Sequence, residues 1–332
     1  MKSFYCVILI IICTYGCSAP VKEYTGSFTV ISKNHRFIDS LLSDSTDGGE
    51  QEVNVWMTLP DQEKFSPPFP AVVLSHSSWG LSSQEQFYAS IFKQMGIATI
   101  VIDSFTPRGV RKTSLDQSRV SSASMINDAY EVLDYLKKSN LFQRDKIALM
   151  GFSKGGIVAL YSAFEDVRVQ FPEENSFAAH IAYYPWCGMR LVNMKLTGAP
   201  LLIIGGDKDI VTPVSKCQIM ISEEVEDEQQ SLISINELKN ARHAFDHPVL
   251  ARLPFPISMN AQVPANCEIR QRGQGEFYEV HSNEIVSGDN IKLILEQCSA
   301  YNGVAGYNKE ATQNALSITK EFLAKHLLSD YE

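Results

Sequence analysis

Short runs of consecutive apolar residues recur through the first two thirds of the chain, each bounded by turn-forming residues. Strands buried on both faces of a parallel sheet have this pattern, whereas a strand with one face in water alternates apolar and polar positions. The runs therefore predict the inner strands of a parallel sheet. They lie at residues 71–74, 98–102, 147–150, 180–184 and 201–204.

Segments with apolar residues at helical spacing lie between these runs. Strands that alternate with helices predict a mostly parallel sheet flanked by helices on both faces. Alternating segments at 26–32 and 52–59 predict antiparallel edge strands joined by a polar loop, and 231–238 predicts a further strand. The predicted helices are 84–95, 120–138, 155–165, 214–224 and a closing amphipathic helix at 309–328.

One α/β domain over residues 25–332 accounts for these elements. Pro and Gly punctuate the segment from about 249 to 308, which we interpret as an insertion or extension of that domain. The chain has 332 residues, of which 45% are hydrophobic and 20% charged, enough to bury a large core. Its net charge of −9 argues against nucleic-acid binding, which needs a basic face to neutralise phosphates.

Residues 1–18 have the pattern of a signal peptide. Lys2 precedes an apolar run at 4–13, which is shorter than the roughly 20 residues of a membrane span. Gly16 and Cys17 resemble a bacterial lipoprotein processing site, although Thr14 stands where that pattern usually has Leu. The sequence predicts an exported protein, periplasmic or secreted, with lipid attachment at Cys17 and simple cleavage as the two alternatives.

Four cysteines follow Cys17, and in an oxidising compartment they favour two disulfides. Four cysteines allow three pairings. We favour Cys187 with Cys217 and Cys267 with Cys298, and we expect a disulfide to pin the 249–308 segment to the body. Buried free thiols are the alternative, because free Cys is a common core residue.

Ser153 is the candidate nucleophile. It lies in Gly151-Phe152-Ser153-Lys154-Gly155, directly after the predicted strand 147–150 and before a predicted helix. To act as a nucleophile, a Ser hydroxyl needs an adjacent base, and the oxyanion formed in the reaction needs hydrogen-bond donors that stabilise it. One known solution places Ser on a tight strand-to-helix turn, where flanking glycines permit close backbone approach.

The acid and the base of such a triad follow Ser in the chain order Ser, acid, His. After the strand 201–204, Asp207 and Asp209 stand in an acidic turn, and either side chain could orient a histidine. His243 follows the next strand and is the candidate general base, with His247 as its local competitor.

The oxyanion hole of this arrangement needs two backbone amides. We expect one from Lys154, the residue after the nucleophile, and one from Ser77 in the turn after the strand 71–74, with Ser78 as the near alternative. His76 in the same turn is interpreted as a loop-ordering residue rather than a second base.

Several short motifs, each weak alone, form a specific set between residue 50 and the closing helix. They are His76 with Gly80, Asp103-Ser104-Phe105-Thr106-Pro107-Arg108-Gly109, the motif at 151–156, Tyr183-Tyr184-Pro185, the Asp209 turn with Pro213, and His243-Ala244-Phe245. As a set they resemble the dienelactone hydrolase family of α/β-hydrolases. The named enzyme of that family uses Cys where this chain has Ser153, so the resemblance implies ester hydrolysis in general rather than dienelactone as the substrate.

The resemblance also favours Asp209 over Asp207, because the family has Gly, two residues and then the acid. It implies that Arg108 binds a substrate carboxylate, the alternative being an Arg108–Asp103 pair that braces the loop. Independently of the family, Trp79 and Trp186 follow strand ends and are candidate walls of an apolar pocket, with core packing as the alternative.

The predicted function is hydrolysis of small or medium carboxylic esters by a Ser-His-Asp triad through an acyl-enzyme. The alternatives are a peptidase or amidase of the same fold and a non-catalytic exported binding protein. The histidines and cysteines lack metal-ligand spacing, so no metal and no cofactor is expected. The expected partner is a small-molecule ester, with membrane contact only through a lipid on Cys17.

Overall fold

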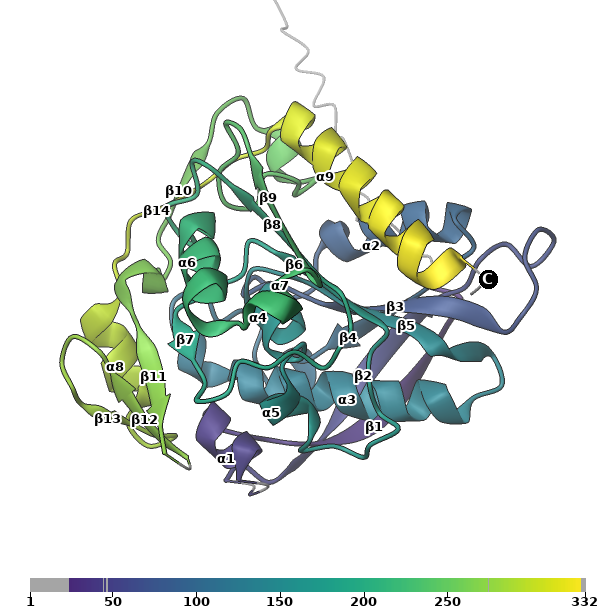
Figure 1. The fold of residues 1–332 in the computed structure, drawn as a ribbon. Helices are drawn as coiled ribbons and strands as arrows, with labels where there is room; N and C mark the ends of the chain where they lie inside the picture. Colours follow the sequence, from purple (N-terminus) through teal and green to yellow (C-terminus); the bar gives the residue numbers. More distant parts are fainter. Residues whose placement is uncertain (1–23, 44, 46, 274, 330–332) are drawn as a thin grey trace, which may run out of the picture.

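The computed structural model of the protein describes residues 24–43, 45, 47–273 and 275–329 (Figure 1). The expected signal peptide at 1–18, with Gly16 and Cys17, lies outside the described residues. Within them, no helix has the length and apolar character needed to cross a membrane.

In the described part of the chain, eight strands form a sheet in the order β1-β2-β4-β3-β5-β6-β8-β9. The pairs β1–β2 and β2–β4 are antiparallel and the other pairs are parallel, which confirms the predicted antiparallel edge. The inner strands are buried along their length, as the unbroken apolar runs require. The strands of this sheet are β1 (Gly26–Lys33), β2 (Glu50–Thr58), β3 (Phe69–Ser75), β4 (Ala98–Asp103), β5 (Phe142–Phe152), β6 (Ala179–Tyr183), β8 (Leu201–Gly206) and β9 (Ile233–Leu238).

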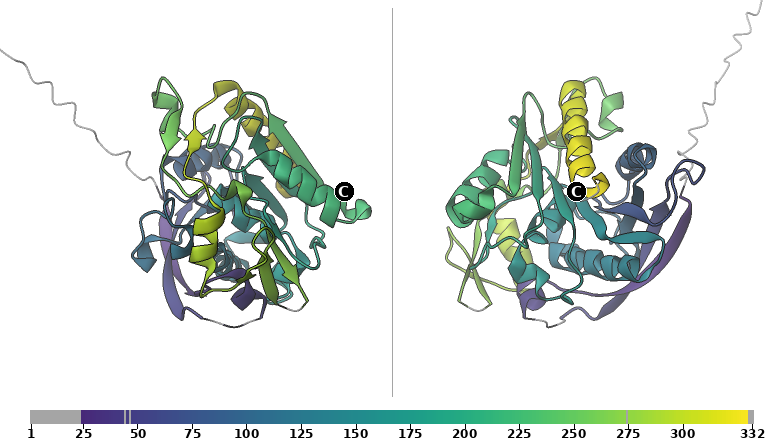
Figure 2. Two further views of the ribbon diagram at one scale, coloured as in Figure 1. Left: turned by 90° about the vertical axis from the view of Figure 1, so that its left-hand side faces the viewer. Right: turned by 45° about the vertical axis from the view of Figure 1, so that its right-hand side comes forward.

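Helices cover both faces of this sheet, as Figure 2 shows from two sides, and each face has its own apolar core. Helices α3, α4 and α6 pack on one face, whereas α2 and α9 pack on the other. The fold is therefore the α/β-hydrolase type, with a mostly parallel sheet between two helical layers. The helices are α1 (Ile38–Leu42), α2 (Ser83–Gln94), α3 (Ser122–Lys138), α4 (Lys154–Tyr161), α5 (Glu165–Arg168), α6 (Val214–Glu224), α7 (Asp227–Gln230), α8 (Ile291–Cys298) and α9 (Lys309–Leu323), which continues into a π-helical turn, Ala324–Leu328.

Local sequence fixes where the main helices begin. Ser82 and Glu85 form a capping box at the start of α2, in which each side chain satisfies a backbone amide of the first turn. The Ser121 hydroxyl accepts the Ser124 amide at the start of α3, and Asn308 caps α9 in the same way. These caps lie within two residues of the helix starts expected from the apolar spacing.

The connection between β1 and β2 differs from the expected polar loop. It contains the short helix α1, whose Ile38 and Leu41 are buried against the core, as is Phe37 directly before the helix. A single helical turn with two apolar positions is too short to give a detectable period, which explains why the sequence pattern indicated only a loop.

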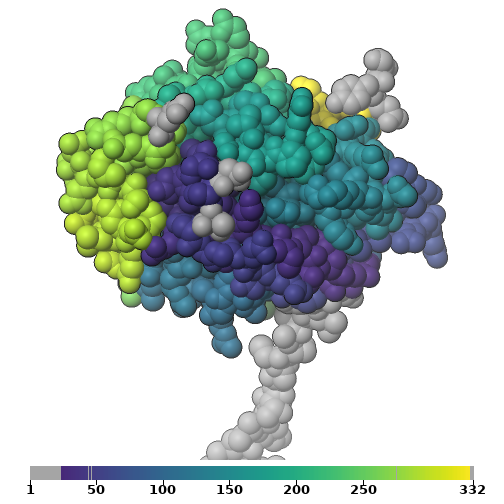
Figure 3. Space-filling view, turned by 90° about the horizontal axis from the view of Figure 1, so that it is seen from below, coloured from purple at the N-terminus to yellow at the C-terminus, as the bar shows by residue number. Residues whose placement is uncertain are grey.

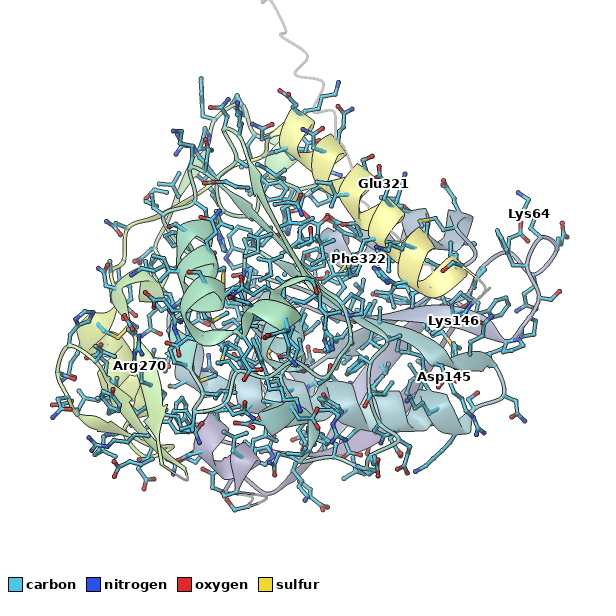
Figure 4. The ribbon with its side chains drawn as sticks, viewed as in Figure 1. Lys64, Asp145, Lys146, Arg270, Glu321 and Phe322 are labelled. Atoms are coloured by element: carbon cyan, nitrogen blue, oxygen red, sulfur yellow. A yellow bond between two sulfur atoms is a disulfide. The ribbon has the colours of Figure 1, made fainter. Side chains whose placement is uncertain are left out.

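The 249–308 segment folds into small elements at one side of the main sheet, on the left of Figure 1. Strand β11 pairs in parallel with β7, and this pairing attaches the segment to the body. Arg270 of β11, labelled in Figure 4, adds an ion pair to Glu224 of α6 at 3.1 Å. The small strands are β7 (Met189–Arg190), β10 (Ile257–Met259), β11 (Ile269–Arg272), β12 (Glu276–Glu279), β13 (Ile285–Val286) and β14 (Gly303–Ala305).

Both expected disulfides are confirmed. Cys187 bonds to Cys217, and Cys267 bonds to Cys298. The expectation that a disulfide pins the 249–308 segment to the body is wrong, because Cys267 and Cys298 both belong to that segment. Their bond ties the last residue of α8 to the residues before β11, so it braces the segment internally.

Candidate active site

Ser153 stands at a sharp turn between β5, which ends at Phe152, and α4, which begins at Lys154. Its φ of 53° lies in the left-handed region that non-glycine residues rarely adopt. The Ser153 amide donates to the Tyr183 carbonyl at 2.9 Å, which helps to hold this conformation. Backbone strain of this kind concentrates at functional sites, and here it directs one hydroxyl out of the end of the sheet.

The glycines around Ser153 are required by close backbone approach. A Cβ on Gly151 would lie 2.0 Å from the Gly155 carbonyl oxygen, and a Cβ on Gly155 would lie 2.0 Å from that of Ser75. No side chain fits at such distances. The two glycines therefore let α4 start directly against the ends of β5 and β3.

A hydrogen-bonded chain links Ser153 to a histidine and an acid. His243 Nε2 lies 3.0 Å from Ser153 Oγ, and His243 Nδ1 lies 2.8 Å from Asp209 Oδ2. The second carboxylate oxygen, Oδ1, accepts the amides of Val211 and Thr212 at 2.8 and 3.0 Å. These amides fix the carboxylate so that Oδ2 faces the imidazole.

Thr212 and Tyr184 also hold this group in place, although the sequence pattern indicates neither role. Thr212 Oγ1 lies 3.1 Å from Asp209 Oδ2, 3.2 Å from His243 Nδ1 and 2.9 Å from the Tyr184 carbonyl. The Tyr184 ring packs edge-to-face against His243 at 4.9 Å. Tyr184 appeared only as part of a family motif, and no residue pattern pointed to Thr212, because both act through contacts between separate strand ends.

The Tyr184 hydroxyl donates to a buried carboxylate beneath the site, that of Asp246, at 2.8 Å. Asp246 also accepts from the Tyr88 hydroxyl at 2.6 Å and from Gln84 Nε2 at 3.1 Å. Burial raises the pKa of Asp246, and these donors act in the opposite direction by satisfying the charged form. The network anchors the ring on which His243 rests.

The two competing residues, Asp207 and His247, do not take part in this hydrogen-bonded chain. Asp207 is exposed, whereas Asp209 is buried. His247 is buried, its Nδ1 accepts the Val249 amide at 3.2 Å, and its Nε2 has no partner among the described residues. Burial lowers the pKa of His247 to about 4, so it is neutral at physiological pH.

The two expected oxyanion donors also lie at the site. Ser77 and Lys154 both line the same cavity as Ser153. Within the described residues, neither the Ser77 amide nor the Lys154 amide donates to another protein group. Lys154 is the first residue of α4, where backbone amides are left free by the helix geometry. His76 Nδ1 lies 2.8 Å from the Ser77 carbonyl, in agreement with a loop-ordering role.

The Lys154 side chain is buried beside the site. Its Nζ donates to the carbonyl and the side-chain oxygen of Gln117 at 2.7 and 3.2 Å. Burial lowers the pKa of the Lys154 ammonium to about 7, while the Asp116 carboxylate acts in the opposite direction. The folded protein therefore holds this group near its point of deprotonation at neutral pH.

We expect Lys154→Met to change how stability depends on pH. Between about pH 7 and pH 10 the unfolded chain keeps a proton on Lys154 that the folded chain has lost. The unfolding free energy of the wild type should therefore rise relative to Lys154→Met, by about 1.4 kcal/mol per pH unit. Urea unfolding at several pH values measures this difference. A difference in unfolding free energy that does not change with pH would contradict the prediction. The matched control is Lys93→Met, because Lys93 is exposed.

Trp79 and Trp186 lie where an apolar pocket wall was expected. Both line a cavity of about 130 Å³ that also contains Ser153 and His243. Trp186 Nε1 donates to the Pro264 carbonyl at 2.8 Å, and Trp79 packs edge-to-face on His247 at 5.4 Å. The Trp186 indole N–H and the Trp79 ring are thus held by contacts in the wall of the cavity.

Arg108 does not occupy the position expected of a carboxylate-binding residue. Its guanidinium is buried and bonds both oxygens of Asp128 at 2.8 Å, while its Nε donates to Asn34. It does not line the cavity that contains Ser153. The alternative prediction was an ion pair between Arg108 and Asp103 that braces the loop. Arg108 does brace the loop, but its partner is Asp128 of α3. Asp103 instead accepts the amides of Phe105 and Thr106.

A comparison with protein families decides what this chain is. The model of the dienelactone hydrolase family matches residues 54–268, which include the Ser153, Asp209 and His243 segments. The chain belongs to the dienelactone hydrolase family. It is accordingly a hydrolase of the class that acts on ester bonds. In the described ranges, no group of three or more His, Cys, Asp or Glu side chains could hold a metal ion.

Individual relatives of this dienelactone hydrolase family member are distant. An abhydrolase domain-containing protein from Dictyostelium discoideum is 27% identical over 163 residues, which are 48% of this chain and 38% of that protein. The chain thus matches well under half of the length of that relative. An esterase structure from Thermogutta terrifontis is 14% identical, with a TM-score of 0.49 over 85% of this chain and 91% of the esterase. A serine hydrolase homologue from Coxiella burnetii is 17% identical, with a TM-score of 0.42 over 59% and 85% of the two chains.

Proposed function

We propose that this chain is an exported serine hydrolase that cleaves carboxylic esters with Ser153 as nucleophile, His243 as general base and Asp209 as the acid that orients it. The observation that carries the proposal is the continuous chain Ser153 Oγ–His243 Nε2 and His243 Nδ1–Asp209 Oδ2, at 3.0 and 2.8 Å. Distances of this size are within the reach needed for proton transfer between nucleophile and base.

In the proposed reaction, Ser153 Oγ attacks the ester carbonyl carbon while its proton passes to His243 Nε2. The negative charge on the carbonyl oxygen is held by the Ser77 and Lys154 amides, which have no other acceptor among the described residues. The carbon–oxygen bond to the alcohol then breaks, and His243 gives its proton to the departing oxygen. Water, deprotonated by His243, then attacks the acyl carbon, the bond from that carbon to Ser153 Oγ breaks, and His243 returns the proton to Oγ as the acid is released.

Export is a separate part of the proposal. Its support is the signal-like pattern of residues 1–18 together with the Cys187–Cys217 and Cys267–Cys298 disulfides, which persist in oxidising compartments. Cys17 remains the candidate site of a lipid anchor. Radiolabelled palmitate incorporation that is lost in Cys17→Ala distinguishes lipid attachment from simple cleavage.

The triad proposal is tested with a fluorophosphonate probe and a short-chain nitrophenyl ester. We expect stoichiometric labelling, a mass increase confined to the peptide that contains Ser153, and steady ester turnover that the label abolishes. A label on a different serine would overturn the nucleophile assignment. Absence of both labelling and turnover of any ester would instead favour a binding protein on a hydrolase scaffold.

A further inference from the structure

The active-site cavity extends away from Ser153 into a region that we call the acyl chamber. Its walls come from three helices that are distant in sequence: the start of α1, the start of α3, and α8 of the 249–308 segment. The six side chains grouped under this name are apolar, while Ser121 and Ser122 at the start of α3 line the same cavity with hydroxyl groups. The residues of the acyl chamber are Phe37, Ile38, Ala123, Ile126, Ile291 and Leu295.

The acyl chamber and the catalytic histidine lie on different sides of Ser153. His243 follows β9 at one edge of the sheet, whereas Ser153 follows the central strand β5. Helix α3 packs on β1, β3 and β5, which lie between the opposite edge of the sheet and the strand that carries Ser153, and α1 packs on α3. In the proposed reaction the alcohol must leave next to His243, which protonates it, so the acyl group is the part that points toward α3 and α8.

The cations near the cavity are already engaged. Of the described residues, Arg36 and Lys154 are the Arg and Lys side chains that line it. Arg36 pairs with Asp289, and Lys154 Nζ donates twice to Gln117. Arg108, the residue expected to bind a carboxylate, is held by Asp128 outside the cavity. The apolar walls of the acyl chamber offer no charge of their own to a carboxylate on the acyl group, so burying a carboxylate against them is unfavourable.

Volume limits the size of this acyl group. The whole cavity measures about 130 Å³ with the catalytic centre included. A dry cavity of roughly 150 Å³ lined by aliphatic and aromatic side chains is enough to bind benzene. The available space therefore corresponds to an acyl chain of about four to six carbons.

Helix α8 is built as a fixed wall. Its inward residues are Ile291, Ile294 and Leu295, while Leu293 on the opposite side is 53% exposed. The helix is held at its end by the Cys267–Cys298 bond. Phe37 packs edge-to-face on Phe277 at 5.3 Å and joins the segment to α1, and Figure 3 shows the yellow-green surface of the segment directly beside the purple N-terminal surface.

We propose that the acyl chamber selects uncharged apolar acyl groups of about four to six carbons, and that Ile291 and Leu295 of α8 set the upper limit of chain length. This inference rests on the proposed ester hydrolysis and names its substrate class. Removing methylene groups from a wall lengthens the chain that fits, because the closed end of an apolar pocket discriminates by size.

The test uses nitrophenyl esters from acetate to dodecanoate with the wild type, Ile291→Ala, Leu295→Ala and the matched control Leu293→Ala. We expect the wild-type kcat/KM to peak at about four to six carbons and fall beyond. Ile291→Ala and Leu295→Ala should raise kcat/KM for eight- and ten-carbon esters about tenfold. Leu293→Ala should keep the wild-type profile, because its side chain points to solvent.

A substitution that enlarges a wall residue tests the proposal even where the alanine substitutions in α8 prevent folding. Ala123→Leu, on the α3 wall, should move the optimum to shorter chains. The proposal would be overturned if every wall variant kept the wild-type dependence of kcat/KM on acyl chain length. It would also be overturned if the wall variants changed kcat/KM for acetyl esters of longer alcohols instead. Faster hydrolysis of a nitrophenyl hemisuccinate than of the butyrate would also overturn it. These outcomes differ from failure of the proposed function, in which the wild type cleaves none of the esters.

Discussion

Ser153→Ala should lower kcat for ester hydrolysis by roughly 10⁴- to 10⁶-fold, while the protein stays folded. Alanine removes the oxygen that attacks the ester carbonyl in the first step of the proposed reaction, and water held by His243 is a poor substitute because it is not fixed at the strained turn. The backbone amides of Ser77 and Lys154 remain in Ser153→Ala, which should leave a residual rate above the uncatalysed reaction. Initial rates with a butyrate ester measure the loss.

A second serine that lines the same cavity provides the control for this substitution. Ser122, the first residue of α3, should lose far less activity than Ser153 on substitution with alanine, because among the described residues no hydrogen bond joins its hydroxyl to Ser153, His243 or Asp209. Both variants should keep the wild-type unfolding temperature within a few degrees. Substantial turnover in Ser153→Ala, at more than one hundredth of the wild-type rate, would show that another group supplies the nucleophile.

The parts of the site that follow from local chain geometry could be predicted from sequence. The tight turn at Ser153 requires glycines at 151 and 155, and that requirement appears directly as a motif after a buried strand. The turn with Asp207 and Asp209 and the segment with His243 were found because they follow later strands, whose carboxyl ends meet at one edge of the sheet, while the choice of Asp209 came from the family resemblance. Patterns of this kind combine local sequence with a simple rule of topology.

Contacts between distant segments could not be predicted in this way. Arg108, in the turn after β4, pairs with Asp128 of α3, and no spacing rule links the two residues. The acyl chamber needs α1, α3 and α8 to meet, and the apolar residues of α8 alone look like ordinary core positions. The role of Thr212 depends in the same way on the separate turns that carry Tyr184 and His243.

Asp209→Asn should lower kcat by roughly 10³- to 10⁴-fold, with little change in folding. In the wild type, Oδ1 of Asp209 accepts the Val211 and Thr212 amides, and Oδ2 accepts from His243 Nδ1. The asparagine oxygen must keep the two backbone amides, which turns its NH₂ group toward Nδ1. His243 then accepts at Nδ1 and carries its proton on Nε2, where it can no longer take the proton of Ser153.

Asp207→Asn is the matched control, because it makes the same chemical change two residues away in the same turn. Asp207 is exposed, so its substitution should leave kcat within about twofold of the wild type. Steady-state kinetics of the two variants, with the fluorophosphonate labelling rate as a second readout, compare the acids directly. The labelling rate should fall with Asp209→Asn, since it depends on the same deprotonation of Ser153. Equal kinetics in Asp209→Asn and the wild type, with a loss in Asp207→Asn, would transfer the role of the acid to Asp207 and imply that the turn rearranges when substrate binds.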